Sequence, residues 1–175
     1  MTRYFLIYLI AHCSMAVFAQ EAMKTRPSPL AIASTRNKTT YIKITYSQPH
    51  KNGRAIFGAL VPFGQVWRTG ANEATEITTT KDITLNGIML KAGTYSIFTI
   101  PGKDKWTIII NADVGLWGSY NYNAKQDVIR FDVPVQTAED VYEPLTLQFD
   151  AATDVANLLI LWDKTKVSIP IKFFN

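Results

Sequence analysis

The stretch Ile83-Thr84-Leu85-Asn86-Gly87-Ile88-Met89-Leu90 decides the fold class, because it is the strongest local signal in the chain. Two short apolar segments, 83–85 and 88–90, flank an Asn-Gly pair, and both of those residues tolerate the positive φ angles of a type I′ turn. The sequence therefore predicts a two-residue β-hairpin at 83–90.

Strand patterns continue outward from this hairpin. Apolar and polar residues alternate over three segments, 42–46, 145–149 and 167–171. This alternation is typical of strands with one buried and one solvent-exposed face. A Pro-Gly turn separates two further segments, 94–100 and 105–111. Both are apolar on both faces in places, which favours central strands covered on both sides. Further strands are expected at 76–80, 128–133 and 157–162, with a turn at 163–166 leading into the last strand.

One segment interrupts the alternation. The apolar residues of 54–61 have helical spacing, and Pro62 would end such an element, so a short helix or single turn is expected there. With about nine strands at short spacing, the sequence predicts an all-β fold, namely a two-sheet antiparallel sandwich or jelly roll with one short helical turn.

The first nineteen residues have the organisation of a secretory signal peptide. A short positive start at 2–4 precedes an apolar run at 5–18 that is too short to span a bilayer as a stable helix. Cleavage is expected after Ala19, where small residues meet the requirement of signal peptidase. A lipid anchor on Cys13 is disfavoured, because His12 stands where a small residue is expected.

The expected organisation is a signal peptide at 1–19, an N-terminal arm or linker at 20–29 and a single β-sandwich domain at 30–175. This predicts a secreted or periplasmic protein, with no transmembrane segment after signal removal. Residues 20–175 contain no Cys and one His, His50, which excludes disulfides, Cys-based zinc sites and a His-rich metal centre. No cofactor is expected, and a Ser-His-Asp triad built on His50 is disfavoured because that residue lies in a turn-like stretch.

Basic residues concentrate in the first third of the mature chain. Residues 20–72 carry eight Lys and Arg against one Glu, a net charge of +7, whereas residues 73–175 carry nine Lys and Arg against thirteen Asp and Glu, a net charge of −4. The sum of +3 is too small for a dedicated nucleic-acid-binding protein, so no nucleic acid partner is expected. Either a solvated basic face or a local patch for an anionic ligand is compatible with this distribution.

The most unusual part of the sequence is the loop-like run 62–75, which combines Gly, Trp, Arg, Asn and Glu. In one interpretation, five side chains hold a sugar or carboxylate through bidentate hydrogen bonds and ring stacking: Arg54, Trp67, Arg68, Asn72 and Glu73. In the other, Arg68 and Glu73 pair with each other or with loop backbone to brace a long connection, and Trp67 is a core plug.

A second candidate cluster is aromatic and rich in amides. Trp117, Tyr120 and Tyr122 lie in a segment with little strand pattern, together with Asn121 and Asn123. Aromatic faces with polar rims suit carbohydrate, so these residues could extend a ligand site. The alternative is a packed loop whose Tyr hydroxyls and Asn amides satisfy its own backbone.

Three runs of the sequence carry a family resemblance: GRAIFGALVPFGQVWRTGANEAT at 53–75, KAGTYSIFTIPG at 91–102 and WGSYNY at 117–122. They resemble a family of secreted bacterial proteins catalogued only as a domain of unknown function, number twenty-nine eleven, over nearly all of residues 28–171. The resemblance implies an exported single-domain protein with no established activity. It therefore leaves the function to be argued from the residues.

The leading hypothesis is an exported binding protein that holds a small polar ligand, sugar-like or anionic. One rival is a hydrolase that uses Glu73 as acid or base; a glycosidase mechanism needs a second carboxylate facing it, for which Glu76 and Asp113 are the candidates. The other rival is a structural or interaction protein of the cell envelope.

Overall fold

Nine β-strands, all paired antiparallel, make up the computed structural model, which describes residues 25–174. The strands are β1 (Leu30–Asn37), β2 (Thr40–Ser47), β3 (Thr75–Thr79), β4 (Ile83–Leu85), β5 (Ile88–Leu90), β6 (Gly93–Ile100), β7 (Lys105–Asn111), β8 (Asp127–Ala151) and β9 (Val155–Phe173). Within 25–174 the only helical element is a 3-10 turn, η1 (Ala124–Gln126). The prediction of an all-β fold with about nine strands is confirmed.

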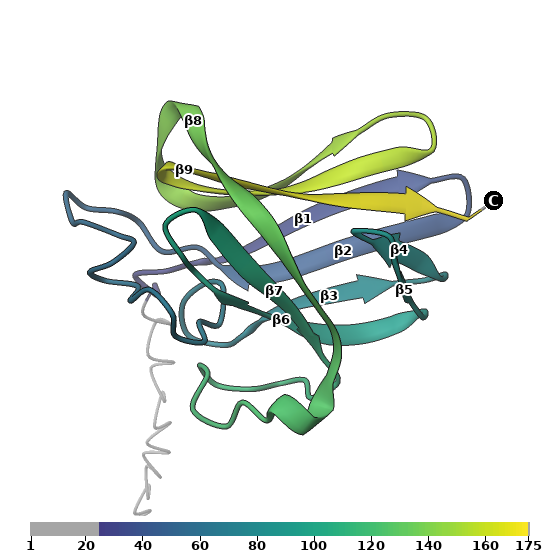
Figure 1. The fold of residues 1–175 in the computed structure, drawn as a ribbon, viewed down its shortest axis with the longest axis horizontal. Coiled ribbons are helices and arrows are strands. Elements are labelled where there is room, and N and C mark those ends of the chain that lie inside the picture. The colour runs from purple at the N-terminus through teal and green to yellow at the C-terminus, as the bar shows by residue number, and fades with distance from the viewer. Residues whose placement is uncertain (1–24, 175) are drawn as a thin grey trace, which may run out of the picture.

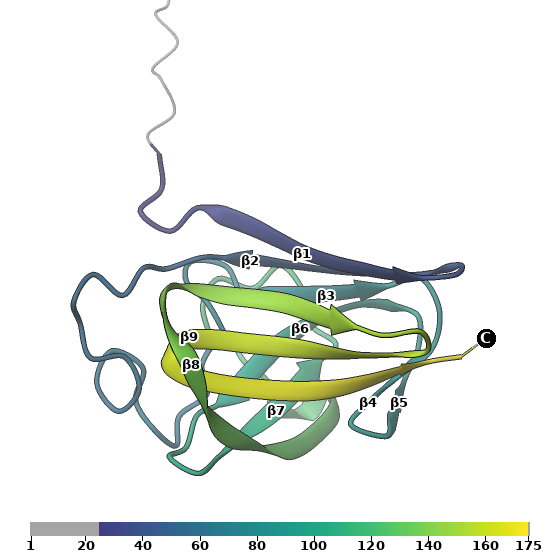
Figure 2. The ribbon, with the colours of Figure 1, turned by 90° about the horizontal axis from the view of Figure 1, so that it is seen from above.

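Hydrogen bonds connect the nine strands into one sheet, in the order β1-β2-β3-β6-β7-β8-β9-β4-β5. A sandwich or jelly roll of two separate sheets is therefore not confirmed. The long strand β8 accounts for the difference, because residues 127–134 pair with β7 and residues 135–151 pair with β9. The register shifts on either side of Tyr142, and β8 bends so that the sheet folds over its own interior (Figures 1 and 2).

The folded sheet is tied across its interior near one end. The backbone N–H of Leu147 in β8 donates to the Tyr46 hydroxyl of β2 at 3.2 Å. Just beyond β2, the Pro49 carbonyl accepts a hydrogen bond of 2.9 Å from the N–H of Leu145. These bonds fix the segment after β2 against β8, and the candidate site begins in that segment.

The alternation predicted for 42–46 determines which side chains enter the core. Ile42 and Ile44 are fully buried, whereas Lys43 between them is half-exposed. Burial of each such Ile side chain contributes about 1.5–3 kcal/mol. Strands β6 and β7 are covered on both faces, as expected, because Phe98 and Ile109 pack in a second apolar cluster outside the main core.

The hairpin prediction at 83–90 is confirmed. Strands β4 and β5 pair across Asn86 and Gly87, whose φ angles of 48° and 80° are those of a type I′ turn. Strand β4 also pairs with β9, which attaches the hairpin to the end of the sheet.

Two local predictions need correction. Residues 54–61 form hydrogen-bonded turns and no helix, since Gly58 has a left-handed φ of 85° that an α-helix does not accommodate. The expected turn at 163–166 is instead part of β9, which continues through Asp163 at a φ of 54°. A single left-handed residue lets a strand change direction without ending.

Strand β1 has no counterpart among the predicted strands. Its side chains alternate between exposed and more buried positions, but the large apolar residues Leu30 and Ile32 are 63% and 62% exposed while the small residues Ala31 and Ala33 face the core. The sequence of β1 therefore lacks apolar–polar alternation. The predicted signal peptide, Cys13 and residues 20–24 of the predicted arm lie outside the described residues. In the described range 25–174, no helix is long and apolar enough to cross a membrane.

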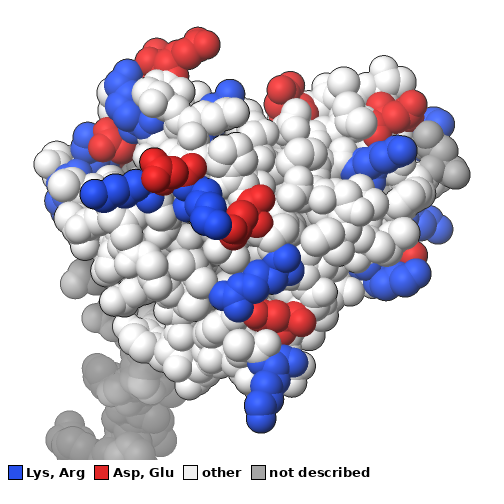
Figure 3. Space-filling model, in the orientation of Figure 1, with Lys and Arg blue, Asp and Glu red and all other residues white. Residues whose placement is uncertain are grey.

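Charged side chains of both signs alternate on the face of the molecule seen in Figure 3. Oppositely charged side chains also pair at the surface of the molecule, as Lys105 and Asp132 do at 2.6 Å. This face has no extended patch of a single sign, in agreement with charges that are mainly solvated.

Candidate functional site

A pocket of about 470 Å³ lies at the end of the sheet where three segments meet. Its walls come from the loop between β2 and β3, from Ser119 and Tyr120 in the loop between β7 and β8, and from Pro27 and Ser28 before β1. Trp162 of β9 lies at its inner side. The volume is in the range of pockets that hold small molecules.

The loop that carries the run 62–75 is fixed by backbone hydrogen bonds. Trp67 and Thr99 exchange two of them, at 2.7 and 2.9 Å, so the loop adds a short pairing to β6. The N–H of Thr75 donates to the Arg68 carbonyl at 3.1 Å, and the Thr75 hydroxyl donates to the Thr69 carbonyl at 2.9 Å. Thr69 is fully buried with a left-handed φ of 57°, a strained conformation for a β-branched residue that its surroundings hold in place.

Arg68 lines the pocket from this fixed loop, and its side chain has no hydrogen-bond or ion-pair partner among residues 25–174. Its Nε is buried and has no hydrogen bond, and its guanidinium has no ion pair with any Asp or Glu in 25–174. Desolvation lowers the pKa of Arg68, and the nearby Tyr120 hydroxyl acts in the opposite direction. The guanidinium stays charged at neutral pH, so the described lining holds a half-buried cation with no acidic side chain beside it.

The rest of the described lining contains one further cation, Arg54, and no acidic residue. Arg54 also lines the pocket, but its Nε donates to the Lys51 carbonyl at 2.9 Å and its Nη2 donates to the His50 carbonyl. The Arg54 guanidinium is thus partly committed to backbone, whereas that of Arg68 is not. The described lining thus carries two guanidinium groups and no carboxylate.

Trp67 belongs to the core more than to the pocket surface. Its ring stacks on Trp162 with a centroid distance of 6.0 Å, and its Nε1 donates to the Gly70 carbonyl at 3.1 Å. The residue is 8% exposed. Trp67 is therefore a core plug that forms the floor of the pocket.

Asn72 and Glu73 lie outside the pocket that Arg68 lines. Glu73 pairs with Arg26, whose Nη1 donates to both carboxylate oxygens at 2.7 and 3.0 Å. This hydrogen-bonded pair lowers the pKa of Glu73. The side-chain amide of Asn72 donates to the Ser28 carbonyl at 3.3 Å. Arg68 and Glu73 do not pair with each other, which was one of the two ways in which they were expected to brace the loop.

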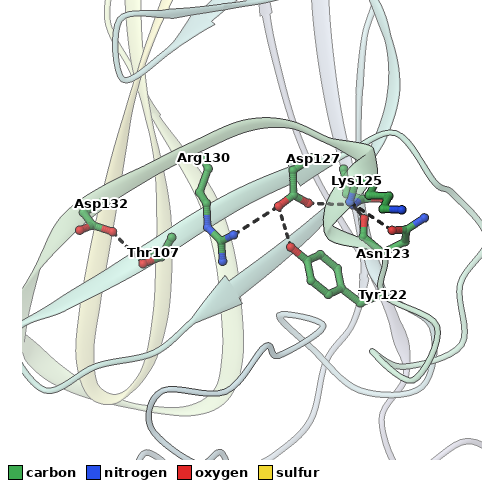
Figure 4. Close-up of polar contacts among 8 residues, drawn as sticks. Thr107, Tyr122, Asn123, Lys125, Asp127, Arg130 and Asp132 are labelled. Atoms are coloured by element: carbon green, nitrogen blue, oxygen red, sulfur yellow. Dashed lines mark hydrogen bonds and ion pairs between the residues drawn. The ribbon is translucent and has the colours of Figure 1, made fainter.

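The second aromatic cluster divides among three environments. Tyr120 is 83% exposed at the mouth of the pocket, and Trp117 is 56% exposed beside Glu73, with which it shares a backbone bridge. The Tyr122 hydroxyl donates to Asp127 Oδ2 at 2.6 Å (Figure 4), and its ring packs edge-on against Phe98. Desolvation and the Asp127 carboxylate raise the pKa of Tyr122 to about 12. Tyr122 thus anchors the loop that carries Tyr120.

A separate hollow of about 110 Å³ is bordered by Glu73 and Glu76, the residues considered for acid–base chemistry. The Glu76 carboxylate accepts a hydrogen bond of 2.7 Å from the N–H of Gly115. Searching 25–174 for three or more neighbouring His, Cys, Asp and Glu side chains that could hold a metal ion finds no such group.

Several residues of the pocket could not be recognised from the sequence. His50 lines the pocket, but its sequence signal is weak, namely a polar side chain in the turn-like stretch after β2. Trp162, Ser28 and Ser119 reach the pocket only through the folding of the sheet, and nothing in their local sequence marks them.

Comparison with known proteins yields one match. The model of the family described as "Protein of unknown function (DUF2911)" matches residues 28–171. No curated protein and no solved structure matches the chain.

Proposed function

The chain belongs to this family, whose description assigns no activity, and we propose from the pocket itself that the protein binds a small anionic ligand, with Arg68 as the principal contact. A sugar acid or another hydroxylated carboxylate fits best, because Arg68 supplies a forked donor while Asn52, Gln65 and Ser119 supply neutral polar groups around it.

The observation that carries the proposal is the unpartnered, half-buried guanidinium of Arg68 in a pocket whose described lining has no carboxylate. Buried polar groups are almost always hydrogen-bonded, so an exception calls for an explanation, and a bound ion is one of them. An anion in the pocket would supply the missing charge and accept from the guanidinium in a low-dielectric setting. The fixed backbone on both sides of Arg68 limits the entropy lost on binding.

The test is a thermal-shift panel that pairs each anion with a neutral counterpart. D-glucuronate is compared with D-glucose, citrate with glycerol, and glucose 6-phosphate with glucose, each up to 50 mM, about the upper end of weak millimolar binding. At least one anion should raise Tm while its counterpart does not, with stabilisation following RT ln(1 + [L]/Kd).

Arg68→Met should abolish that shift, whereas Arg36→Met, which removes a guanidinium stacked on Tyr41 outside the pocket, should keep it. A panel in which no anion raises Tm, or a shift that survives Arg68→Met, would contradict the proposal. The first of these results would favour a structural or interaction protein of the cell envelope.

A hydrolase that uses Glu73 has one observation in its favour, since Glu73 and Glu76 border the same small hollow. The lowered pKa of Glu73 stabilises its ionised form, which disfavours it as a proton donor. If the protein hydrolyses a glycoside, Glu73→Gln should eliminate that turnover; full activity in this variant would exclude Glu73 as acid or base.

We also propose export, with removal of residues 1–19. The support is the charged start, the apolar run and the small residues before Gln20. Mass spectrometry of the protein recovered from secreting cells should give a chain that begins at Gln20, and an intact N-terminus there would contradict this proposal.

A further inference from the structure

The short segment before β1 forms one wall of the pocket. Pro27 and Ser28 line the pocket, and the Pro29 carbonyl accepts a hydrogen bond of 2.8 Å from the N–H of Gln48. The backbone is thus anchored at Pro29, where the sheet begins. Residues 26–28, called the wall segment below, extend past that anchor.

Two adjacent loop residues hold the wall segment through their side chains. Glu73 binds Arg26 through both carboxylate oxygens, and Asn72 binds the Ser28 carbonyl. Both also contact the buried hydroxyl of Ser47, which accepts from Asn72 at 3.3 Å and donates to Glu73 at 3.4 Å. The side chains of Ser47, Asn72 and Glu73, called the latch below, therefore connect β2 to the wall segment.

We infer that Asn72 and Glu73 are positioning residues of the pocket, which fix the wall segment and so set the affinity for the ligand without touching it. This inference rests on the proposed function. Arg68 lies in the same loop, which supports the inference. One rigid loop then presents the Arg68 guanidinium to the ligand and also holds the wall segment in place.

A pure field effect on an anion would have a different signature. Loss of the Arg26 charge would weaken anion binding, whereas loss of the Glu73 charge would strengthen it. Loss of the wall weakens binding in both cases. The signs of the two single variants therefore separate positioning from electrostatics.

The test uses calorimetric titration of D-glucuronate and inorganic phosphate into the full chain. Arg26→Ala and Glu73→Gln should each weaken the tighter probe about two- to five-fold, the range of one exposed ion pair, and the double variant should be no weaker than either single one. Lys91→Ala, which removes the exposed pair with Asp82, is the matched control and should leave affinity unchanged. Unchanged or tighter binding in Glu73→Gln, or losses that add in the double variant, would overturn the inference.

Asn72 is tested with its backbone conformation preserved. Its φ of 55° is left-handed, so Asn72→Gly removes the side-chain amide without strain, and Asn86→Gly at a φ of 48° in the distant hairpin is the control. Weaker binding in the first variant alone is expected; equal affinities in both variants would exclude Asn72 from the latch.

A second readout is independent of any ligand. The ¹⁵N relaxation of the Ser28 amide should report greater motion in Arg26→Ala and Glu73→Gln than in wild type or Lys91→Ala. If wild type binds neither probe, the proposed function fails for these ligands while the latch is still decided by this measurement. An unchanged Ser28 signal in both variants would overturn the latch even if the anions bind.

Discussion

Glu73 forms its ion pair with Arg26, 47 positions away, and not with Arg68, which precedes it by five positions in the same loop. The loop backbone explains this choice. Thr69 and Asn72 both have left-handed φ angles, so the chain between Arg68 and Glu73 turns and sends the two side chains to different sides. Glu73 therefore pairs with the wall segment, and Arg68 has no acidic partner among residues 25–174.

Removal of the unpartnered Arg68 guanidinium should raise the free energy of unfolding of the ligand-free protein. An unsatisfied buried donor costs about 1–3 kcal/mol, and Met fills a similar volume without a polar group, so Arg68→Met should gain about 1 kcal/mol. For a chain of this size, that gain raises Tm by about 2–4 °C in thermal denaturation followed by circular dichroism. A clear fall in Tm would instead indicate that Arg68 braces the loop.

The close approach of Gly70 to β2 should make this position intolerant of a side chain. A Cβ there would lie 3.0 Å from the Ser47 carbonyl oxygen and 3.2 Å from the Thr75 hydroxyl. We expect Gly70→Ala to destabilise the fold by about 1–3 kcal/mol in urea denaturation, because backbone cannot move away as a flexible side chain can. A loss below about 0.5 kcal/mol, typical of surface positions, would mean that the loop is less constrained than its hydrogen bonds indicate.

Much of the fold could be predicted because local signals and burial agree. The Asn86-Gly87 turn and the alternation around Ile42 and Ile44 have the conformations that their residue types favour. Strand β9 was divided at 163–166 in the prediction, since a polar Asp-Lys-Thr-Lys stretch resembles a turn when its pairing with β8 is unknown. Strand β1 was not predicted because its outward side chains Leu30 and Ile32 are apolar and its inward ones are small, which hides the alternation of burial in the sequence.

The candidate site could be predicted only where it is local in sequence. The run at 62–75 identified Arg68 and the core role considered for Trp67, both of which depend on neighbouring residues. The partner of Glu73 depends on how the segment before β1 returns to the loop, and the position of Trp162 depends on the fold of the whole sheet. Long-range placement of this kind leaves no mark in a single sequence.

Substitution of the buried Trp67 and of the exposed Trp117 should differ in its effect on the free energy of unfolding. Trp67→Phe loses the hydrogen bond to the Gly70 carbonyl and part of the stack on Trp162, and should cost about 1–3 kcal/mol. Trp117→Phe changes a ring that is 56% exposed, and should stay within about 0.5 kcal/mol of wild type. Urea denaturation of both variants checks this; similar losses in the two would contradict the assignment of Trp67 to the core.

The Tyr122–Asp127 hydrogen bond should make stability depend on alkaline pH. The pKa of Tyr122 is raised to about 12 in the folded protein, above the ordinary value of 10 that applies to the unfolded chain. The contribution is complete below pH 10, where the hydroxyl keeps its proton in both states. It is lost as pH rises from about 10 to about 12, because the unfolded chain then releases its proton first.

Tyr122→Phe isolates this contribution from the other tyrosines. Wild type should be more stable than the variant by about 1–2 kcal/mol at pH 8, since the lost hydrogen bond has a charged acceptor. That difference should shrink between pH 10 and pH 12 in urea denaturation, because only wild type can lose the Tyr122 proton. A difference that stays constant over this range would mean that the contact with Asp127 does not raise the pKa of the Tyr122 hydroxyl. Packing against Phe98 alone would then anchor the loop.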